Sequence, residues 1–382
     1  MNRVFRSQAL QALANVALAA SALAFGRVWA AENVAIDPDL EKAPLWDNTF
    51  NLKTWSGYKD NVLFSPENAV ESPFVAVGLD ALLWRLPADG WEYLIVASGE
   101  YIRYVPGEQV DQEATALAQA QARKDFGNGW ETVASADYLY FNQVFDNSLF
   151  DREFSSIQVE GHSLTIRPSL RWEFGQGPFL EMEGFVTRQS FKSVVDDEWQ
   201  AGPKLTLGRT YGNRSEISFG YQLTDRQFDT REPRAPTGDF IAGESLEFFQ
   251  HEFFAVWRHF WDQQRRWRTL TRFSFQRNDD NESGYYDYYR PRLAHQVRYA
   301  AKTWQVQADA KWTYYHYDVQ PVGFGDSSLR RKTLVQVSIR GEKNLLKSLK
   351  LFVEYEHERS ISNLRFDDYQ ANTVLGGLDW EF

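Results

Sequence analysis

Basic side chains recur at alternate positions over residues 265–340, a spacing that lets them act together. In an extended strand, successive side chains point to opposite faces, so residues two apart share a face. Guanidinium and ammonium groups on one face attract anions and donate hydrogen bonds to carboxylate or phosphate oxygens. The bases predicted to share one face are Arg266, Arg268, Arg272, Arg290, Arg292, Arg298, Lys311, Lys332 and Arg340.

Acidic side chains follow the same spacing on two other segments, and they are Glu181, Glu183, Glu354, Glu356 and Glu358. One hypothesis is that acids and bases pair across neighbouring strands, at a few tenths to about 1 kcal/mol per pair. The other is that the separated charges create a field across a water-filled pore and select anionic solutes. The three later glutamates follow Lys332 and Arg340, which favours pairing there. For the basic cluster as a whole, both hypotheses stand.

The six histidines do not form a catalytic pattern. Nucleophilic catalysis needs a base within hydrogen-bond reach of a hydroxyl and a third group that orients the base. No Gly-x-Ser-x-Gly element is present. His251 and His259 share a face but lie about 26 Å apart, too far to bind one metal ion. Segments 279–282 and 367–368 are acidic but lack the spacing of a calcium loop. We predict no enzyme activity, no metal site and no cofactor.

Strands must carry these side chains, because apolar and polar residues alternate through most of the chain. The alternating segments are joined by connections that are short and long in turn. The short turns are predicted near 88–90, 127–129, 175–177, 211–213, 262–264, 300–302 and 342–344. The long loops are predicted near 58–72, 106–111, 145–157, 191–197, 229–243, 278–284, 319–329 and 361–369.

Seven short turns and eight long loops give sixteen strands. They are predicted to start near 46, 73, 91, 112, 130, 158, 178, 198, 214, 244, 265, 285, 303, 330, 348 and 370. Fourteen or eighteen strands are also compatible with the sequence, because segments 31–57 and 114–123 are weakly patterned. An even number of strands with connections that alternate in length is typical of an outer-membrane barrel. We therefore predict an all-β fold, a transmembrane antiparallel meander β-barrel over residues 46–382, with both termini in the periplasm.

Composition agrees with a barrel that is apolar outside and polar inside. Aromatic residues make up 16% of the 382 residues. After residue 30 no run approaches the roughly 20 apolar residues that a membrane-spanning helix needs, which excludes a helical membrane protein. A soluble β-sandwich or propeller is the alternative, but it would not explain the tryptophans beside the short turns. These tryptophans suit an aromatic girdle at a membrane surface, and they are Trp91, Trp130, Trp261, Trp267 and Trp304.

The first thirty residues have the pattern of an export signal. Arg3 and Arg6 precede an uncharged apolar run, and Val28 and Ala30 supply the small residues that precede a cleavage site. We predict a signal peptide over 1–30 and a short periplasmic segment over 31–45. Without the signal, 38 bases face 52 acids, a net charge of −14, which argues against nucleic acid as a partner. The chain has no cysteine, which excludes a lipoprotein anchor and a disulfide framework.

Two segments resemble known outer-membrane proteins. The closing segment resembles the signal that the barrel-assembly machinery of Gram-negative bacteria recognises, through Val374, Leu378, Trp380 and Phe382. The stretch 56–62, Ser-Gly-Tyr-Lys-Asp-Asn-Val, resembles the G-Y-x-D-N-V element of a family of putative outer-membrane β-barrel porins, some of them found with polysaccharide-export systems. The resemblance implies an integral protein of the bacterial outer membrane, in contact with its lipid and lipopolysaccharide. It leaves a homotrimer, common among porins, as an expectation.

Three functional hypotheses follow, in this order. The first is a diffusion porin, general or anion-leaning, with loop 229–243 folded into the lumen as a constriction. The second is an export barrel for an exopolysaccharide or another polymer, which would work with periplasmic partners. The third is a barrel lipase or protease, which would need a histidine and a nucleophile or an aspartate clustered at one rim.

Overall fold

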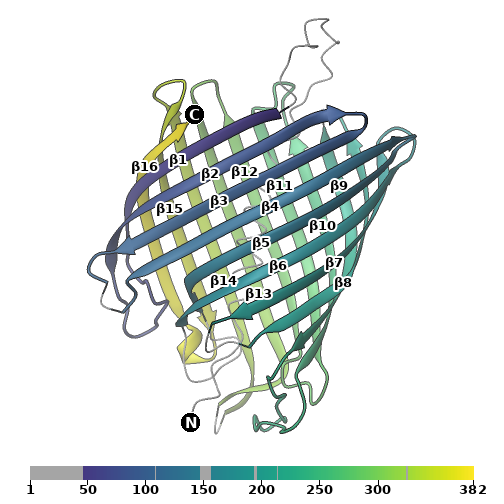
Figure 1. Ribbon diagram of the computed structural model, residues 1–382. Helices are drawn as coiled ribbons and strands as arrows, with labels where there is room; N and C mark the ends of the chain where they lie inside the picture. Colours follow the sequence, from purple (N-terminus) through teal and green to yellow (C-terminus); the bar gives the residue numbers. More distant parts are fainter. Residues whose placement is uncertain (1–45, 108, 147–155, 193–195, 213, 324–325) are drawn as a thin grey trace, which may run out of the picture.

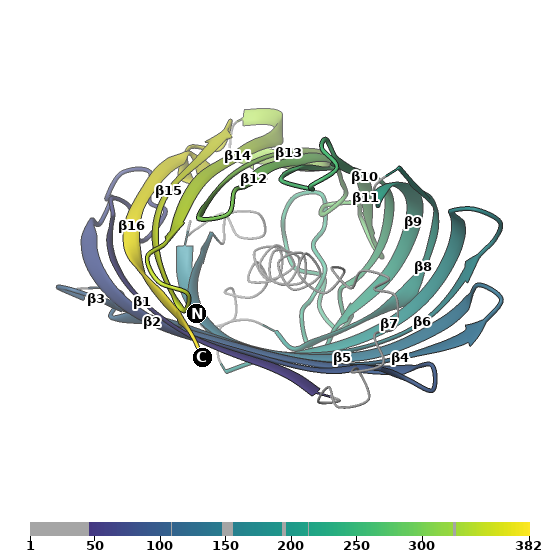
Figure 2. The same cartoon turned by 90° about the horizontal axis from the view of Figure 1, so that it is seen from above.

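The computed structural model describes residues 46–382, apart from residues 108, 147–155, 193–195, 213 and 324–325. Over this range the strands form one closed antiparallel barrel of sixteen, in which each strand pairs with its neighbours in sequence and β16 closes onto β1 (Figure 1). The ring is flattened when it is viewed along its axis (Figure 2). The predicted all-β, sixteen-stranded meander is confirmed. No helix in the described part of the chain is long and apolar enough to cross a membrane.

The strands are β1 (Trp46–Lys59), β2 (Ser72–Ala88), β3 (Trp91–Tyr104), β4 (Gln112–Gly127), β5 (Trp130–Asp146), β6 (Ser156–Glu173), β7 (Pro178–Phe191), β8 (Glu198–Tyr211), β9 (Ser215–Phe228), β10 (Glu247–Phe260), β11 (Trp267–Asp280), β12 (Tyr288–Ala300), β13 (Trp304–Gly323), β14 (Asp326–Asn344), β15 (Leu349–Ser362) and β16 (Tyr369–Glu381). A single short 3-10 helix, η2 (Arg365–Asp367), is described, in the last long loop. Each strand starts within four residues of its predicted position. The signal peptide and segment 31–45 lie outside the described residues.

Two predicted connections are wrong. The final short turn lies at 345–348 rather than 342–344, because the β14–β15 ladder continues to the pair Asn344↔Lys350. The loop predicted at 319–329 is mostly strand, because β13 and β14 continue as a hairpin beyond the neighbouring strands. A loop was predicted here because the segment is polar. Two of these polar residues, Gln320 and Arg330, are instead buried and hydrogen-bonded to each other.

The outer surface is apolar and carries aromatic residues at both rims. At the short-turn rim, Trp261 is 60% exposed, and the other four predicted girdle tryptophans also face outward. At the long-loop rim the outward aromatics include Trp199, Phe249 and Tyr289. On β12, Tyr289 and Tyr299 lie ten residues apart, which is about 33 Å along the strand and about 25 Å across a wall tilted by about 40°. This height matches the apolar band of an outer-membrane barrel.

The seam between β1 and β16 is tightly packed around one inward tryptophan. The ladder pairs Trp55 with Gly377 on one side and with Ala76 on the other. A Cβ atom on Gly377 would lie 2.2 Å from the carbonyl oxygen of Thr54 and 2.5 Å from the Cβ of Trp55. A Cβ on Gly78 would lie 3.1 Å from the same indole. The two glycines therefore provide the space in which Trp55 lies against the inner wall.

Candidate functional site

Eight predicted bases lie on the inner face of one continuous part of the wall, β11 to β14. On these strands the other face carries exposed apolar side chains such as Phe273, Leu293 and Ile339. The strand ladders set Arg268 opposite Arg298 and Arg340 opposite Gln307. The eight are Arg268 and Arg272 on β11, Arg290, Arg292 and Arg298 on β12, Lys311 on β13, and Lys332 and Arg340 on β14. Arg266 differs from the prediction, because it lies in the turn before β11 and pairs with Asp262 at 2.8 Å.

The bases differ in how they are compensated. Arg340 pairs with Glu342 at 2.7 Å and with Glu354 at 2.9 Å. Arg272 pairs with Glu252 at 2.9 Å. Arg268 instead donates to the amide oxygen of Gln296 at 2.6 Å. Carboxylate pairing is therefore shown for Arg340 and Arg272, whereas Arg268 is bound through a neutral amide.

The predicted acids also face inward, and most are paired. Glu181 lies 3.8 Å from Arg171, and Glu183 lies 3.4 Å from Lys204. Glu354 pairs with Arg340 as above. Glu358 accepts hydrogen bonds from Gln336 at 2.6 Å and from the hydroxyl of Tyr369 at 2.5 Å. Glu356 lies between them on β15, opposite Ser338 and Thr373. These five glutamates therefore lie on β7 and β15, on either side of the basic strands, where inward acids and bases are mixed.

The acids that face the basic wall are on β2 to β5, and the sequence analysis missed them. Four strands separate this group from β10–β13 in either direction around the ring, so the two groups lie on opposite sides of the barrel. Applying the period-two rule to 73–137 would have found these residues. The inward acids of this wall are Asp80, Glu92, Glu100, Glu113, Asp125, Glu131 and Asp137.

Bases are fewer on this acidic wall. Its inward arginine, Arg123, is held between Glu92 at 3.0 Å and Glu131. On β10 to β13, which lie opposite and carry six of the eight predicted bases, the inward acids between the rims are Glu252 and Asp309. The barrel interior is thus polarised across its width, with an excess of negative charge on β2–β5 and of positive charge on β10–β13.

The long-loop mouth is narrowed by side chains that pack inside the ring. Tyr285 and Tyr286 of loop 281–287 join inward residues of β9, β10, β12 and β13 in one buried cluster. Loop 229–246 adds Leu246 to this cluster, and Arg231 and Arg234 of the same loop reach the hydroxyl of Tyr286 at 3.4 and 3.2 Å. The loop predicted as the constriction therefore contributes to the mouth, together with two tyrosines of the next loop and inward residues of the strands.

Loop 60–71 turns inward across the mouth from the tyrosine cluster. Residues of the G-Y-x-D-N-V element, 57–62, hold it there. Asn61 is 3% exposed, donates to the carbonyl oxygens of Ser65 and Gln370 at 2.9 Å each, and accepts from the Ser65 N–H at 3.0 Å. Asp60 accepts hydrogen bonds from the backbone and side-chain nitrogens of Asn372, both at 2.6 Å. Val62 is 2% exposed within a second apolar cluster. The element thus connects the first loop to the strand that closes the barrel.

Two carboxyl groups in the loops have shifted pKa values. Burial raises the pKa of Asp287 to about 6, and the charge of Asp280 adds to the rise, although the Arg277 guanidinium and a backbone N–H act against it. Asp287 accepts from the Asp280 N–H at 2.7 Å and from Arg277 at 3.0 Å. Hydrogen bonds from Arg188, at 2.7 and 2.8 Å, lower the pKa of Asp229. Both carboxylates tie loops of the mouth to the barrel.

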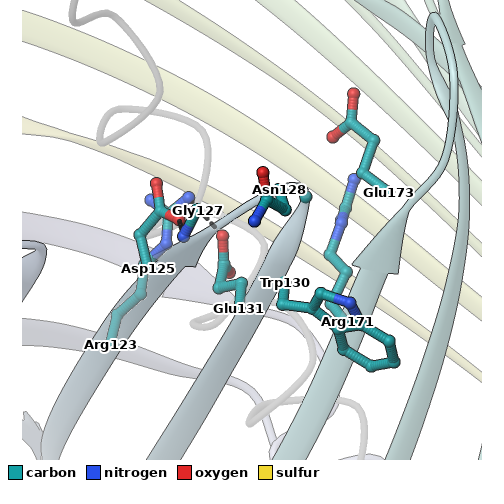
Figure 3. Close-up of a pocket in the computed structure, with 9 residues that line it drawn as sticks. Arg123, Asp125, Gly127, Asn128, Trp130, Glu131, Arg171 and Glu173 are labelled. Atoms are coloured by element: carbon teal, nitrogen blue, oxygen red, sulfur yellow. Dashed lines mark hydrogen bonds and ion pairs between the residues drawn. The ribbon is translucent and has the colours of Figure 1, made fainter.

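A hollow of about 270 Å³ lies at the opposite rim, beside the β4–β5 turn (Figure 3). Arg123, Asp125, Glu131, Arg171 and Glu173 line it from three neighbouring strands. A Cβ on Gly129, whose φ is +81°, would lie 2.0 Å from the carbonyl oxygen of Glu173, so only glycine allows this close approach of the two turns. The hollow thus lies at the rim and is lined by charges of both signs.

The histidines lie on the outer face of the wall. His162 and the Tyr138 hydroxyl are 2.6 Å apart, and His251 and the Tyr221 hydroxyl are 2.7 Å apart. His316 stacks on Tyr289 with ring centroids 5.9 Å apart. Among the described residues, no group of three or more His, Asp or Glu side chains could hold a metal ion. The histidine side chains are thus part of the outer aromatic surface.

No family model matches the chain, and no curated protein matches it. Among solved structures, OccAB1 of Acinetobacter baumannii is 8% identical over 88% of this chain and 97% of that one, with a TM-score of 0.48. OprD of Pseudomonas aeruginosa is 8% identical over 88% and 94%, with a TM-score of 0.45. An anion-selective porin from Comamonas acidovorans is 9% identical over 88% and 99%, with a TM-score of 0.43. At this level the similarity concerns the barrel fold, and function has to be argued from the chain's own residues.

Proposed function

We propose that the protein is a passive channel of the bacterial outer membrane that admits small hydrophilic solutes and prefers anions. Two features support a membrane location. The outer face is apolar between two aromatic rims about 25 Å apart, and closure of β1 onto β16 leaves no unpaired sheet edge for lipid to meet. The outward row of β16, with Trp380 and Phe382 51% and 66% exposed, suits recognition by the assembly machinery. That recognition, contact with lipopolysaccharide and a homotrimer stay predictions.

The opposed charged walls are the observation that carries the channel proposal. A passive pore needs an interior that water and ions can wet, and polar inward faces provide one. Fixed charges on the wall select ions by Coulomb attraction and exclusion. Arg268 and Arg298 face each other directly in the ladder, where like charges repel each other, and an anion between them would neutralise this repulsion. A permeating anion supplies that neutralisation, which is the physical reason to expect anion preference despite the negative net charge of the chain.

The test is the reversal potential of the purified barrel in a planar bilayer under a potassium chloride gradient. The wild type is expected to conduct in steady steps with anion preference. Replacing Arg268 and Arg298 together with glutamate should move the preference toward cations, because the net charge of the basic wall falls by four units. The control, Arg365→Glu, makes half this charge change in the last long loop, where the side chain is 82% exposed. Cation preference of the wild type would contradict the proposal, and absence of current would favour the polymer-export hypothesis.

A further inference from the structure

Loop 281–287 places two tyrosines inside the mouth and is held there by polar contacts at its base. Tyr285 and Tyr286 are each 1% exposed within the buried cluster. The carboxylate of Asp280 accepts hydrogen bonds from three backbone N–H groups of the loop, at 2.8 to 3.0 Å. The β11–β12 ladder ends before the loop begins. The position of the tyrosines therefore depends on these basal contacts.

Three carboxylates share one guanidinium at this base. Arg277 of β11 pairs with Asp279 at 2.7 Å, with Asp287 of the loop at 3.0 Å, and with Asp318 of β13. In the described part of the chain, no other cation lies within 4.0 Å of these three carboxylates. With all three ionised, one positive charge faces three negative ones, and like charges in one site disfavour ionisation. The group therefore gains from binding a proton.

Asp287 is the member of this group that belongs to the loop. Its side chain is 17% exposed, and its second oxygen accepts from the Asp280 N–H at 2.7 Å. Burial raises the pKa of Asp287 to about 6, and the charges of Asp280 and Asp279 add to the rise against the pull of Arg277 and the backbone N–H. An aspartate in water has a pKa of about 3.9. A loop in the mouth therefore binds this proton more tightly than a released loop does.

A second carboxyl contact joins the loop to its neighbour. Glu282 faces Glu244 of loop 229–246, and the hydrogen bond between the two side chains, with the charge of Glu244, raises the pKa of Glu282. Two ionised carboxylates repel each other, whereas one shared proton lets them bond. This contact between the loops of the mouth thus also gains from acid.

One histidine lies close enough to be an alternative source of a pH effect. His316 of β13 stacks on Tyr289 with ring centroids 5.9 Å apart, and the Arg277 guanidinium lies 4.8 Å from the centroid of the same ring. Histidine is the residue type whose charge changes nearest to neutral pH. The test therefore has to separate the imidazole from the carboxyl groups.

We propose that loop 281–287 is a pH-sensitive constriction: protonated Asp287 and Glu282 hold its tyrosines in the mouth, and their ionisation releases the loop and widens the passage. The constriction rests on the proposed channel function and adds regulation to it. The difference between a pKa of about 6 in the docked loop and about 3.9 in a released one shifts the docking equilibrium about tenfold toward the docked loop between pH 7 and pH 5.

The first experiment records single barrels in a planar bilayer while the chamber that faces the long loops is taken from pH 7 to pH 5. The readout is the ratio of time spent in a narrow and in a wide conductance state, because inward carboxylates of the wall also change charge and alter the current amplitude. Acid should raise this ratio about tenfold in the wild type. Asp287→Asn, which is neutral at every pH, should favour the narrow state at both values, and adding Glu282→Gln should remove the remaining pH dependence.

Two variants serve as controls for the electrical experiment. Asp368→Asn removes a carboxylate that pairs with Arg359 at 2.7 Å in the last long loop, and it should keep the full pH response. His316→Gln should also keep it. A wild-type ratio that does not change with pH would overturn the constriction, and so would a response that His316→Gln abolishes.

A second readout needs no current. Leu246 is fully buried in the same cluster as the two tyrosines, so a cysteine at this position reacts with a maleimide when the loop leaves. The ratio of labelling rates at pH 7 and pH 5 should be about tenfold larger in Leu246→Cys than in Leu246→Cys with Asp287→Asn, a comparison in which the titration of the thiol cancels. Equal ratios in a conducting barrel would refute the constriction and leave the channel proposal standing. Different ratios in a barrel without current would support the pH-sensitive loop and contradict the channel.

Discussion

The substitution Asn61→Ala should release the first loop from the inside of the barrel. The Asn61 side chain is 3% exposed and makes three hydrogen bonds to the backbone of Ser65 and Gln370. A buried hydrogen bond of this kind contributes about 1 kcal/mol, so the substitution should weaken loop attachment by about 3 kcal/mol. Since each 1.4 kcal/mol is a factor of ten, the population of the released loop should rise by roughly 100-fold.

The assay uses the absence of cysteine from the chain. A single cysteine at Val62, which is 2% exposed, reports loop release through its rate of reaction with a maleimide in the folded barrel. In the Val62→Cys background, Asn61→Ala should raise this rate toward the 100-fold limit. Single-channel recordings should show larger or more variable conductance, because the loop leaves the lumen side of the mouth.

The control is Asn68→Ala in the same background, since Asn68 is an exposed residue of the same loop and only its backbone N–H is used. Its labelling rate should equal that of the Val62→Cys parent. A rate for Asn61→Ala within threefold of the parent would refute the assigned role of Asn61. Circular dichroism of both variants separates local release from loss of the barrel.

Three further predictions concern the stability of the barrel. It is measured as the temperature at which the barrel no longer migrates as a folded protein in gel electrophoresis. A raised pKa means that the folded state of Asp287 binds its proton more tightly. Its contribution to stability, about 2–3 kcal/mol, is present at low pH and is lost as the pH rises from about 4, the ordinary pKa of an aspartate, through about 6. Asp287→Asn should therefore flatten the decline between pH 4 and 6, and an unchanged pH profile would contradict this. Arg226→Met should destabilise the barrel by about 3–5 kcal/mol, because it leaves the fully buried Glu198 without the guanidinium that lies 2.7 Å away. Adding Glu198→Gln to this variant should restore part of the lost stability. Gly377→Ala should impair closure at the seam between β1 and β16, because the added Cβ would lie 2.2 Å from a backbone oxygen. The control Gly376→Ala should fold normally, because its nearest neighbouring atom lies 3.5 Å away. Equal folding yields of the two variants would show that the seam tolerates the methyl group.

Local physics made most of the fold readable from the sequence. The period-two alternation places Val374, Leu378 and Trp380 on the outer face because adjacent side chains of a strand must point apart, whatever the rest of the chain does. The same rule placed Arg268 through Arg340 on the inner face. It failed at 319–329 and at 342–344, where polar residues belong to extended ladders and the turn itself carries Leu345 and Leu346.

Chain closure decided what alternation could not. Which charges oppose one another depends on where strands meet after a full turn of the ring, and no local pattern encodes that β2–β5 lie across from β10–β13. The inward packing of Tyr285 and Tyr286 and the bonds of Asn61 to a residue more than 300 positions away are likewise long-range. The sequence by itself therefore determined the strands, their faces and the basic wall. Only the closed barrel decided that the acidic wall opposes the basic one, and only the packing of the loops decided the narrowed mouth, because each requires contacts or positions that no single segment encodes.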